Sequence, residues 1–486
     1  MHSLPDRPSL VRGSGLLMVV LTVLLVAVRA APAEAELGLT LGFASDPVLE
    51  PGPAVSGAEW LDRVRAEGGQ IIRVGVSWSG VAPAHPPSGF VASNPASPGY
   101  NWSATDAEIK QLVGAGVTPM ITIDSAPTWA EGPGMPKDAT PGSWRPNVAD
   151  YRAFATAIAT RYDGHYPDPA DPGTFLPRVS IWQGWNEPNL NVYLAPQWQR
   201  SGKHWVAVAP GIFRSLSNAF YAAVKAVNSS NFVVLGGTAP FGDPPGGQRT
   251  PPVEFYRSLF CLDGRVALKP VSCPSGTYFD AIDHHPYSIS SPTTPALNPD
   301  DASIPDIHKI TRVLRAAEKA GRALPKGAKQ VWCSEIAWDT DPPNPQGVPV
   351  QTDARWLEQA FYVLWSQGVH TILWFQVLDN PPVPNYQSTY QEGIYYLDGE
   401  AKPAAVAFRF PFVTTRLSKT EITAWGRSPS SGSLMIEEQT GARWKVLRTV
   451  KVTTHAVFDT KLAVRGAAVL RAQLGSATSL TWSQGR

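Results

Sequence analysis

Two glutamates lie at the ends of strand-like segments, and together they could perform acid–base chemistry. Glu187 sits in the run Trp185-Asn186-Glu187-Pro188-Asn189, just after the apolar segment Val179–Trp182. Glu335 closes a second apolar segment that starts at Val331. Glycoside hydrolysis needs such a pair, because one carboxyl group donates a proton and the other attacks the sugar or activates water. The residue pattern therefore predicts an enzyme that cuts glycosidic bonds.

Strand-like and helical segments alternate along most of the chain. Eight apolar segments are expected to form strands: Leu37–Phe43, Ile71–Trp78, Thr118–Asp124, Val179–Asn186, Phe232–Thr238, Phe279–His285, Gln330–Glu335 and Thr371–Val377. Amphipathic patterns predict helices over Ala58–Ala66, Ala104–Val113, Val148–Arg161, Ile212–Val227, Pro305–Ala320 and Thr352–Trp365. Apolar strands linked by helices are typical of a parallel sheet buried on both faces. Eight repeats predict an α/β fold of the (β/α)8 TIM barrel type.

A doubly wound open sheet is the alternative architecture. It is disfavoured because no glycine-rich phosphate-binding motif follows the first expected strand and because the strands number eight. In a barrel, the loops after the strands meet at one mouth, where active sites are built. Both glutamates are expected at that mouth.

The pattern changes near Phe412, where short segments with a period of two follow one another between turn residues. This pattern predicts a small C-terminal all-β, sandwich-like domain. The expected organisation is a signal peptide over residues 1–35, a catalytic barrel over 36–411 and the β domain over 412–486.

The first residues have the pattern of an export signal. Arg7 and Arg12 precede the apolar run Leu16–Val28, and Ala33-Glu34-Ala35 offers a cleavage site. The apolar run has 13 residues, whereas a membrane-spanning helix needs roughly 20. We therefore expect a secreted protein with no membrane span in the mature chain.

Net charge and cysteine content bear on the possible partners of the chain and on its disulfides. The formal net charge of +1 gives no indication of nucleic acid as a partner. In an oxidising compartment Cys261 and Cys273 could form a disulfide, which leaves Cys333 as a buried strand residue.

At Asn186-Glu187-Pro188 the chain resembles clan A glycoside hydrolases, of the family 39 and family 5 types, over Leu37 to about Phe410. The resemblance implies a (β/α)8 barrel that hydrolyses glycosides with retention of configuration. It implies an acid/base role for Glu187, on the fourth expected strand, and a nucleophilic role for Glu335, on the seventh. The match is loose after Glu335, and the rim loops match nothing that identifies a substrate.

The same resemblance places Arg73 and Tyr287 beside the nucleophile and Trp374 beneath the bound sugar as a platform. Asn186 would hydrogen-bond the sugar 2-hydroxyl. Each has an alternative structural role: Arg73 could pair with any barrel carboxylate, and Tyr287 or Trp374 could fill the top of the barrel.

His284 and His285 suggest a metal site, but adjacent strand residues point to opposite faces and cannot readily ligate one ion. We expect no metal and no cofactor. His285 is expected to hydrogen-bond the sugar or Glu335, with His284 packed or outward. Trp129, just past a strand end, could offer its ring to the apolar face of a sugar.

The expected function is a secreted retaining glycoside hydrolase acting on an oligosaccharide, polysaccharide or simple glycoside. A transglycosidase is a close alternative, since a sugar can intercept the same covalent intermediate. A catalytically inactive carbohydrate-binding surface protein is a third possibility, and the presence of both Glu187 and Glu335 argues against it.

Overall fold

The structure is a computed structural model that describes residues 38–44 and 57–485. The predicted signal peptide, residues 1–35, lies outside this part of the chain. Among the described residues, no helix combines the length and the apolar character needed to cross a membrane.

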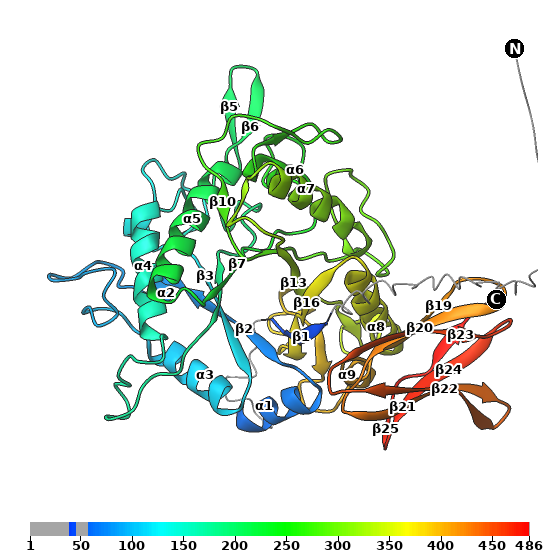
Figure 1. Ribbon diagram of the computed structural model, residues 1–486. Helices are drawn as coiled ribbons and strands as arrows, with labels where there is room; N and C mark the ends of the chain where they lie inside the picture. Colours follow the sequence, from blue (N-terminus) through cyan, green and yellow to red (C-terminus); the bar gives the residue numbers. More distant parts are fainter. Residues whose placement is uncertain (1–37, 45–56, 486) are drawn as a thin grey trace, which may run out of the picture. The chain divides into compact units, whose positions relative to one another are not determined.

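Eight parallel strands close into a barrel in the order β1-β16-β13-β11-β7-β4-β3-β2 (Figure 1). Their bounds are β1 Thr40–Phe43, β2 Ile71–Ser77, β3 Thr118–Asp124, β4 Ile181–Gly184, β7 Phe232–Leu235, β11 Ala281–Asp283, β13 Gln330–Ile336 and β16 Val369–Trp374. Every predicted strand is present, and the (β/α)8 barrel is confirmed. β4 and β13 are the fourth and seventh barrel strands along the chain, so Glu187 follows the fourth strand and Glu335 lies near the end of the seventh.

Helices surround the barrel (Figure 1). They are α1 Gly57–Ala66, α2 Trp78–Val81, α3 Ser103–Gly114, α4 Val148–Arg161, α5 Ala209–Val227, α6 Pro252–Leu259, α7 Ile307–Lys319, α8 Val350–Ser366 and α9 Pro403–Arg409. α5 buries Phe213, Leu216, Phe220 and Val224, whose spacing of three and four residues forms one face. α4 begins after Asn147, whose side chain accepts hydrogen bonds from two backbone N–H groups of the first turn.

The rim loops contain structure that the sequence did not predict. A hairpin of β5 (Trp198–Ser201) and β6 (His204–Ala207) projects from the barrel (Figure 1). α6 lies in a segment for which no helix was predicted, and Cys261 and Cys273 beyond it form a disulfide. Cys333 is free and buried in β13.

The C-terminal region consists of two antiparallel sheets. One contains β19 (Phe412–Arg416), β20 (Glu421–Arg427) and β23 (Val457–Ala463). The other contains β21 (Gly432–Thr440), β22 (Arg443–Val452), β24 (Ala468–Leu474), β25 (Ala477–Thr478) and β26 (Trp482–Gln484). Side chains of both sheets share one apolar cluster that includes Ile422, Phe458, Ile436 and Leu470. A β domain therefore follows the barrel, with the sandwich-like core expected of two packed sheets.

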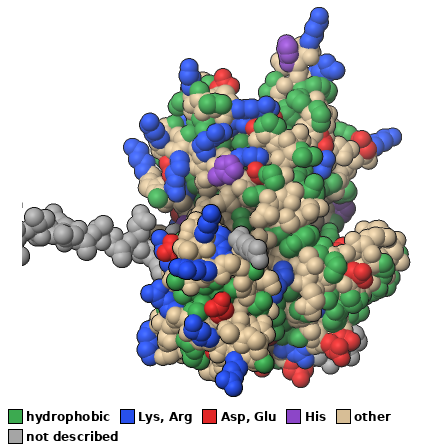
Figure 2. Space-filling model, turned by 90° about the vertical axis from the view of Figure 1, so that its right-hand side faces the viewer, with side chains coloured by type: hydrophobic (Ala, Val, Ile, Leu, Met, Phe, Trp, Pro, Cys, Tyr) green, Lys and Arg blue, Asp and Glu red, His purple; other side chains and the backbone are tan. Residues whose placement is uncertain are grey.

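The β domain and the barrel belong to one compact unit. Trp425 of β20 is buried and packs against Tyr362 and Trp365 of α8. The face shown in Figure 2 carries Lys and Arg side chains spread over the surface, with Asp and Glu side chains between them.

Candidate active site

Side chains inside the barrel form two layers below its mouth. The lower layer is apolar and contains Ile71, Met120, Val234, Ala281, Trp332 and Leu373. Residues two apart on a strand share a face, so the next inward positions lie two residues later. Those positions are polar and buried: Arg73, Thr122, Asp283 and Ser334, with Gln183 from β4 beside them. The candidate site thus rests on a polar layer above an apolar one.

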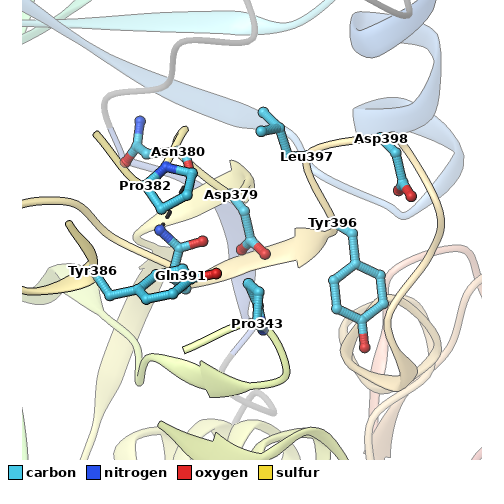
Figure 3. Close-up of a pocket in the computed structure, with 9 residues that line it drawn as sticks. All are labelled: Pro343, Asp379, Asn380, Pro382, Tyr386, Gln391, Tyr396, Leu397 and Asp398. Atoms are coloured by element: carbon cyan, nitrogen blue, oxygen red, sulfur yellow. Dashed lines mark hydrogen bonds between the residues drawn. The ribbon is translucent and has the colours of Figure 1, made fainter. Parts of the chain in front are cut away.

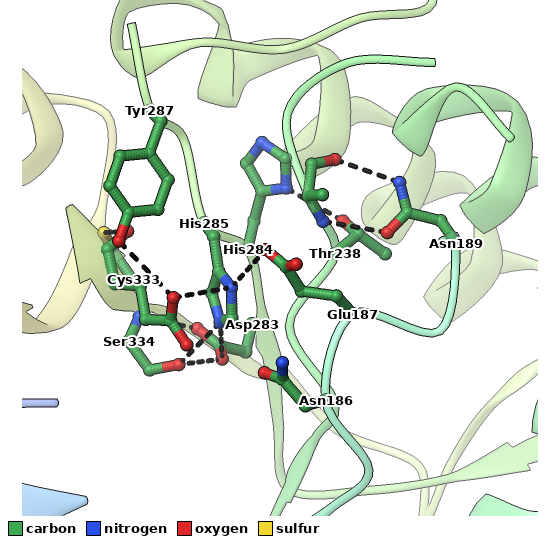
Figure 4. Close-up of polar contacts among 12 residues, drawn as sticks. Asn186, Glu187, Asn189, Thr238, Asp283, His284, His285, Tyr287, Cys333 and Ser334 are labelled. Atoms are coloured by element: carbon green, nitrogen blue, oxygen red, sulfur yellow. Dashed lines mark hydrogen bonds and ion pairs between the residues drawn. The ribbon is translucent and has the colours of Figure 1, made fainter. Parts of the chain in front are cut away.

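Glu187 lies just beyond β4, in a turn with an unusual backbone. Trp185 and Glu187 have φ angles of 78° and 35°, and non-glycine residues adopt this region at a cost of about 1–3 kcal/mol each. Two hydrogen bonds hold Trp185: its backbone N–H donates to the Ile123 carbonyl and its ring N–H to the Tyr193 carbonyl. The turn directs the Glu187 carboxylate toward His285 (Figure 4).

Glu335 owes its position to an irregularity in β13. The register between β13 and β16 shifts between Cys333 and Ile336. Such a shift re-aims side chains that would otherwise alternate between faces. As a result, the consecutive residues Ser334 and Glu335 both approach His285.

Arg73 connects Glu335 with the polar layer. Its Nη1 donates to Glu335 Oε1 at 2.6 Å and its Nη2 to Asn186 Oδ1 at 2.7 Å. Its Nε donates to Gln183 Oε1 at 2.7 Å and to Thr122 Oγ1 at 2.9 Å. Arg73 therefore supplies positive charge to Glu335 and fixes the amide of Asn186 in the same set of contacts.

Tyr287 approaches Glu335 from the segment that follows β11. Its hydroxyl donates to Glu335 Oε2 at 3.4 Å. Burial and the charge of Glu335 raise the pKa of Tyr287 well above its usual value, so the phenol stays protonated as a donor.

His285 is fully buried between the two glutamates (Figure 4). Its Nδ1 lies 3.0 Å from Glu187 Oε1 and 3.6 Å from Glu335 Oε2. Burial alone would lower the pKa of His285, but the carboxylates of Glu335, Asp283 and Glu187 outweigh burial and raise it to about 10. The imidazolium therefore carries a charge that the two glutamates share.

Asp283 supports His285 from below. Its carboxylate accepts hydrogen bonds from the Ser334 backbone N–H at 2.9 Å, from the Ser334 hydroxyl and from Gln183 Nε2 at 2.6 Å. Its Oδ2 lies 3.6 Å from His285 Nε2. Burial would raise the pKa of Asp283, yet the contact with His285 and the hydrogen bonds lower it. Asp283 is thus a buried anion that balances part of the charge on His285.

His284 has a different environment, as expected for the neighbouring strand position. Its Nδ1 contacts Thr238 Oγ1 and its Nε2 contacts the Ala302 carbonyl, both at 2.8 Å. Burial lowers the pKa of His284 to about 4, so this ring is neutral. The carbonyl partner requires a proton on Nε2, which makes Nδ1 the acceptor from Thr238.

One carboxylate oxygen of Glu187, one of Glu335 and a ring nitrogen of His285 all lie within 4.8 Å of one another. Such a cluster is close enough to hold a metal ion. Each group already has a partner within the protein, since His285 Nδ1 contacts Glu187 Oε1 and Arg73 Nη1 donates to Glu335 Oε1. Hydrogen bonding and charge pairing account for the proximity of the three groups.

Trp374 does not lie where a sugar platform was expected. Leu373 belongs to the inward apolar layer, so Trp374 faces outward to α8, where it packs against Phe361 and Trp338. It has no exposed surface, and its ring N–H donates to the Glu392 carbonyl. A platform needs an exposed ring face, so the prediction for Trp374 is corrected: this residue packs the top of the barrel.

Trp129 lies in a short 3-10 turn after β3 and is half-buried. Its ring N–H donates to the Pro83 carbonyl, and the ring packs edge-on against Trp78 and Phe90. No hydrogen bond or ring contact joins Trp129 to the described residues of the glutamate cluster. Its contribution to sugar binding stays a prediction.

Several residues of the cluster were not singled out from the sequence: Asp283, Gln183, Ser334 and Tyr193. For Asp283 a signal existed, because it stands two residues before His285 and so shares its strand face. Tyr193 lies in the loop after Glu187, and burial together with the charge of Glu187 raises its pKa. Its position depends on how that loop folds back, which local patterning does not encode.

A separate cavity of about 540 Å³ lies beside the loop that follows β17 (Gln376–Leu378). Its lining consists of Pro343, Asp379, Asn380, Pro382, Tyr386, Gln391, Tyr396, Leu397 and Asp398 (Figure 3). Neither glutamate is among these residues, so this cavity and the carboxylate pair are distinct features.

Comparisons with known proteins bear on the fold. No family model matches the chain, and no curated protein matches it. Among solved structures it is similar to a family 39 glycoside hydrolase from the gut symbiont Bacteroides cellulosilyticus WH2, at 17% identity over 88% of this chain and 81% of that one, with a TM-score of 0.52. This similarity confirms the (β/α)8 barrel fold.

Two further solved structures have lower sequence identities and TM-scores. A glucosidase from Croceicoccus marinus is 15% identical over 91% of this chain and 96% of that chain, with a TM-score of 0.49. A family 30 endoxylanase from Clostridium papyrosolvens C71 is 11% identical over 90% of this chain and 95% of that chain, with a TM-score of 0.45.

Proposed function

We propose that this chain is an exported glycoside hydrolase that works with retention of configuration, with Glu335 as the nucleophile and Glu187 as the acid/base. The observation that carries the proposal is the approach of the two carboxylates to within 4.8 Å across His285. Retaining enzymes hold their carboxyl groups about 5–5.5 Å apart, whereas inverting enzymes need about 6.5–9.5 Å to admit a water molecule.

In the first step Glu335 attacks the anomeric carbon while the carboxyl proton of Glu187 passes to the glycosidic oxygen. The carbon–oxygen bond to the leaving group breaks, the alcohol departs, and a glycosyl ester forms on Glu335. In the second step Glu187, now a carboxylate, removes a proton from water. The water attacks the same carbon, the ester bond to Glu335 breaks, and the configuration is restored.

The residues around the two glutamates fit the charge that each glutamate carries in the two steps. Arg73 and Tyr287 donate to Glu335, which is negative before attack and again after hydrolysis. Asn186 is held by Arg73 at the point where a sugar 2-hydroxyl would bind. His285 Nδ1 lies 3.0 Å from Glu187 Oε1, so a positive charge stands beside the carboxylate that Glu187 becomes in the second step.

The test is a panel of aryl glycosides with the proton NMR spectrum of the first-formed sugar. The proposal predicts hydrolysis of at least one glycoside with the anomeric configuration retained. A product of inverted configuration, or no turnover of any glycoside, contradicts it. Adding an acceptor alcohol to the same assay distinguishes hydrolysis from glycosyl transfer.

A further inference from the structure

A row of three aromatic side chains starts at Glu335 and ends in solvent. Tyr287 donates to Glu335, and its ring packs edge-on against Phe375 with centroids 6.4 Å apart. Phe375 packs edge-on against Tyr390 at 5.0 Å. Phe375 is half-buried, whereas Tyr390 is 53% exposed. The row therefore presents aromatic surface beside the nucleophile. Trp374 presents none, because it is fully buried.

Tyr390 is held in place by its own loop. The backbone N–H of Asn380 donates to the Tyr390 carbonyl at 2.9 Å, which closes the loop on itself. The next residue, Gln391, donates its N–H to Asp339 Oδ1 at 2.6 Å and its side-chain amide to the Asn380 carbonyl at 3.1 Å. Burial raises the pKa of Tyr390, and the charges of the carboxylates around it, including both Glu335 and Glu187, raise it further. Tyr390 is thus fixed within electrostatic reach of the glutamate pair.

The charged groups around Glu187 and Glu335 restrict the charge of the sugar that can bind there. Every hydrogen-bonding nitrogen of Arg73 is occupied, by Glu335, Asn186 and two side chains of the polar layer. Both ring nitrogens of His285 are occupied as well. Two further acids, Asp124 and Glu392, lie close enough for the charge of Glu335 to raise their pKa values, after burial as the main cause. A carboxylate on the substrate would join this group of acids, while His285 has a protein partner on both ring nitrogens and Arg73 is buried with a protein acceptor on each of its three nitrogens.

We propose that Phe375 and Tyr390 form the surface on which the sugar ring stacks, and that the site selects uncharged sugars over uronates. The inference rests on the proposed function, because it names the substrate class of the same site. Sugar rings present apolar C–H faces that pack on aromatic rings. Like charges brought together in a partly buried site are strongly disfavoured, which gives discrimination by repulsion.

The charge selection is tested with substrates that differ at one position. 4-Nitrophenyl β-glucoside and β-glucuronide share a leaving group and differ only in a CH₂OH or a carboxylate at C5. Matched xylosides and galactosides extend the neutral set. We expect kcat/KM to be at least roughly 100-fold lower for the glucuronide than for the best neutral substrate. Equal or faster cleavage of the glucuronide overturns the charge selection.

The stacking surface is tested with variants of one loop. Tyr390→Ala should raise KM for the best neutral substrate by roughly three- to tenfold, in line with the loss of an aromatic contact. Tyr390→Phe should restore the KM, since the ring remains. Tyr386→Ala is the matched control, because Tyr386 lies on the same loop but lines the separate cavity. An unchanged KM in Tyr390→Ala, or an equal rise in Tyr386→Ala, overturns the role of Tyr390.

Binding separates failure of this inference from failure of the proposed function. Intrinsic fluorescence titration of the Glu335→Gln variant with neutral disaccharides and with glucuronic acid needs no turnover. Neutral sugars should bind, and Tyr390→Ala in that background should weaken them. If the wild type turns over no glycoside yet binds neutral sugars through Tyr390, the proposed function fails and the inference stands. If glucuronic acid binds at least as tightly as the neutral sugars, the inference fails.

Discussion

Glu187 and Glu335 share one cation, because the buried imidazolium of His285 touches both carboxylates. Asp283 beneath it limits the net charge of the cluster. The proton balance of the proposed reaction therefore depends on a residue that neither attacks nor donates to the sugar. This arrangement makes the pH dependence of activity a sensitive test of the site.

His285→Gln should move the bell-shaped pH profile of kcat/KM to higher pH by about one unit. The pKa of His285 is about 10, so the wild-type ring is charged throughout the working range. The substitution removes a positive charge that lies 3.0 Å from Glu187 and 3.6 Å from Glu335, so the acidic and the basic limb of the profile should both move to higher pH. The control is His284→Gln, since His284 is neutral above its pKa of about 4. A profile that stays in place in His285→Gln, or moves equally in His284→Gln, contradicts the shared charge.

Glu187→Ala should lose most activity on substrates whose leaving group must be protonated before it can depart. Substrates with poor leaving groups should slow by about 100- to 10,000-fold, the usual contribution of general acid catalysis. Substrates with activated phenol leaving groups should keep most of their first-step rate. Kinetics across a series of aryl leaving groups measures this, and uniform losses across the series count against the acid role.

The sequence predicts part of the site. The other residues depend on long-range folding that a local pattern does not encode. Glu187 and Glu335 were recognisable because they stand at the ends of apolar strand segments, and Arg73 because the family resemblance places it beside the nucleophile. Trp374 was misjudged, since its orientation depends on the alternation set by Leu373, which a single sequence does not fix. Tyr390 was not considered, because its place depends on the fold of a long loop.

At the scale of elements, the apolar strands and long helices were predictable and the rim was not. The parallel strands are mostly apolar runs, because helices cover one face and side chains fill the barrel on the other, and such runs are recognisable in a sequence. The hairpin β5–β6 and helix α6 lie in polar or Pro-rich stretches, where short elements resemble loops. The register shift in β13 that positions Glu335 depends on pairing with β16, a long-range contact.

The junction between α8 and the β domain contains a buried acid, Glu358. Its carboxylate accepts hydrogen bonds from Arg355 and from the backbone N–H of Phe412, where β19 begins. Burial raises the pKa of Glu358 to about 8, well above the ordinary value of 4.5. A group with a raised folded-state pKa stabilises the fold fully below about pH 4.5, and this stabilisation is lost as pH rises through about 8.

Glu358→Gln should therefore gain stability relative to the wild type as pH rises. Gln keeps the shape and the acceptor but does not ionise, so the difference in Tm should grow between pH 5 and pH 9. Thermal unfolding at several pH values measures this difference. A constant or falling difference over that range shows that Glu358 is already ionised at low pH in the folded protein.

At the scale of the whole molecule, β20 joins the C-terminal sheets to the barrel. Arg427 is fully buried and donates to the Leu39 carbonyl at 3.0 Å and to Gln70 Oε1 at 2.7 Å. Trp425 adds aromatic contacts to α8. Polar and apolar contacts from one strand thus tie the two parts together, which predicts cooperative unfolding.

Trp425→Ala should lower the free energy of unfolding by about 3–5 kcal/mol, the usual cost of truncating a buried tryptophan. Denaturation followed by fluorescence and by residual activity should show one shifted transition. Trp205→Ala on the β5–β6 hairpin is the control, since Trp205 is 39% exposed and should lose much less. Separate transitions for the two probes would mean that the barrel and the β domain unfold independently.

The nucleophilic role of Glu335 is the central claim, and covalent trapping tests it most directly. The enzyme is incubated with the 2-deoxy-2-fluoro analogue of a glycoside that it cleaves, digested, and examined by peptide mass spectrometry. The account predicts one fluoroglycosyl group on the peptide that contains Glu335, and none in Glu335→Gln. A label on Glu187, or turnover with no covalent adduct and an inverted product, would contradict it.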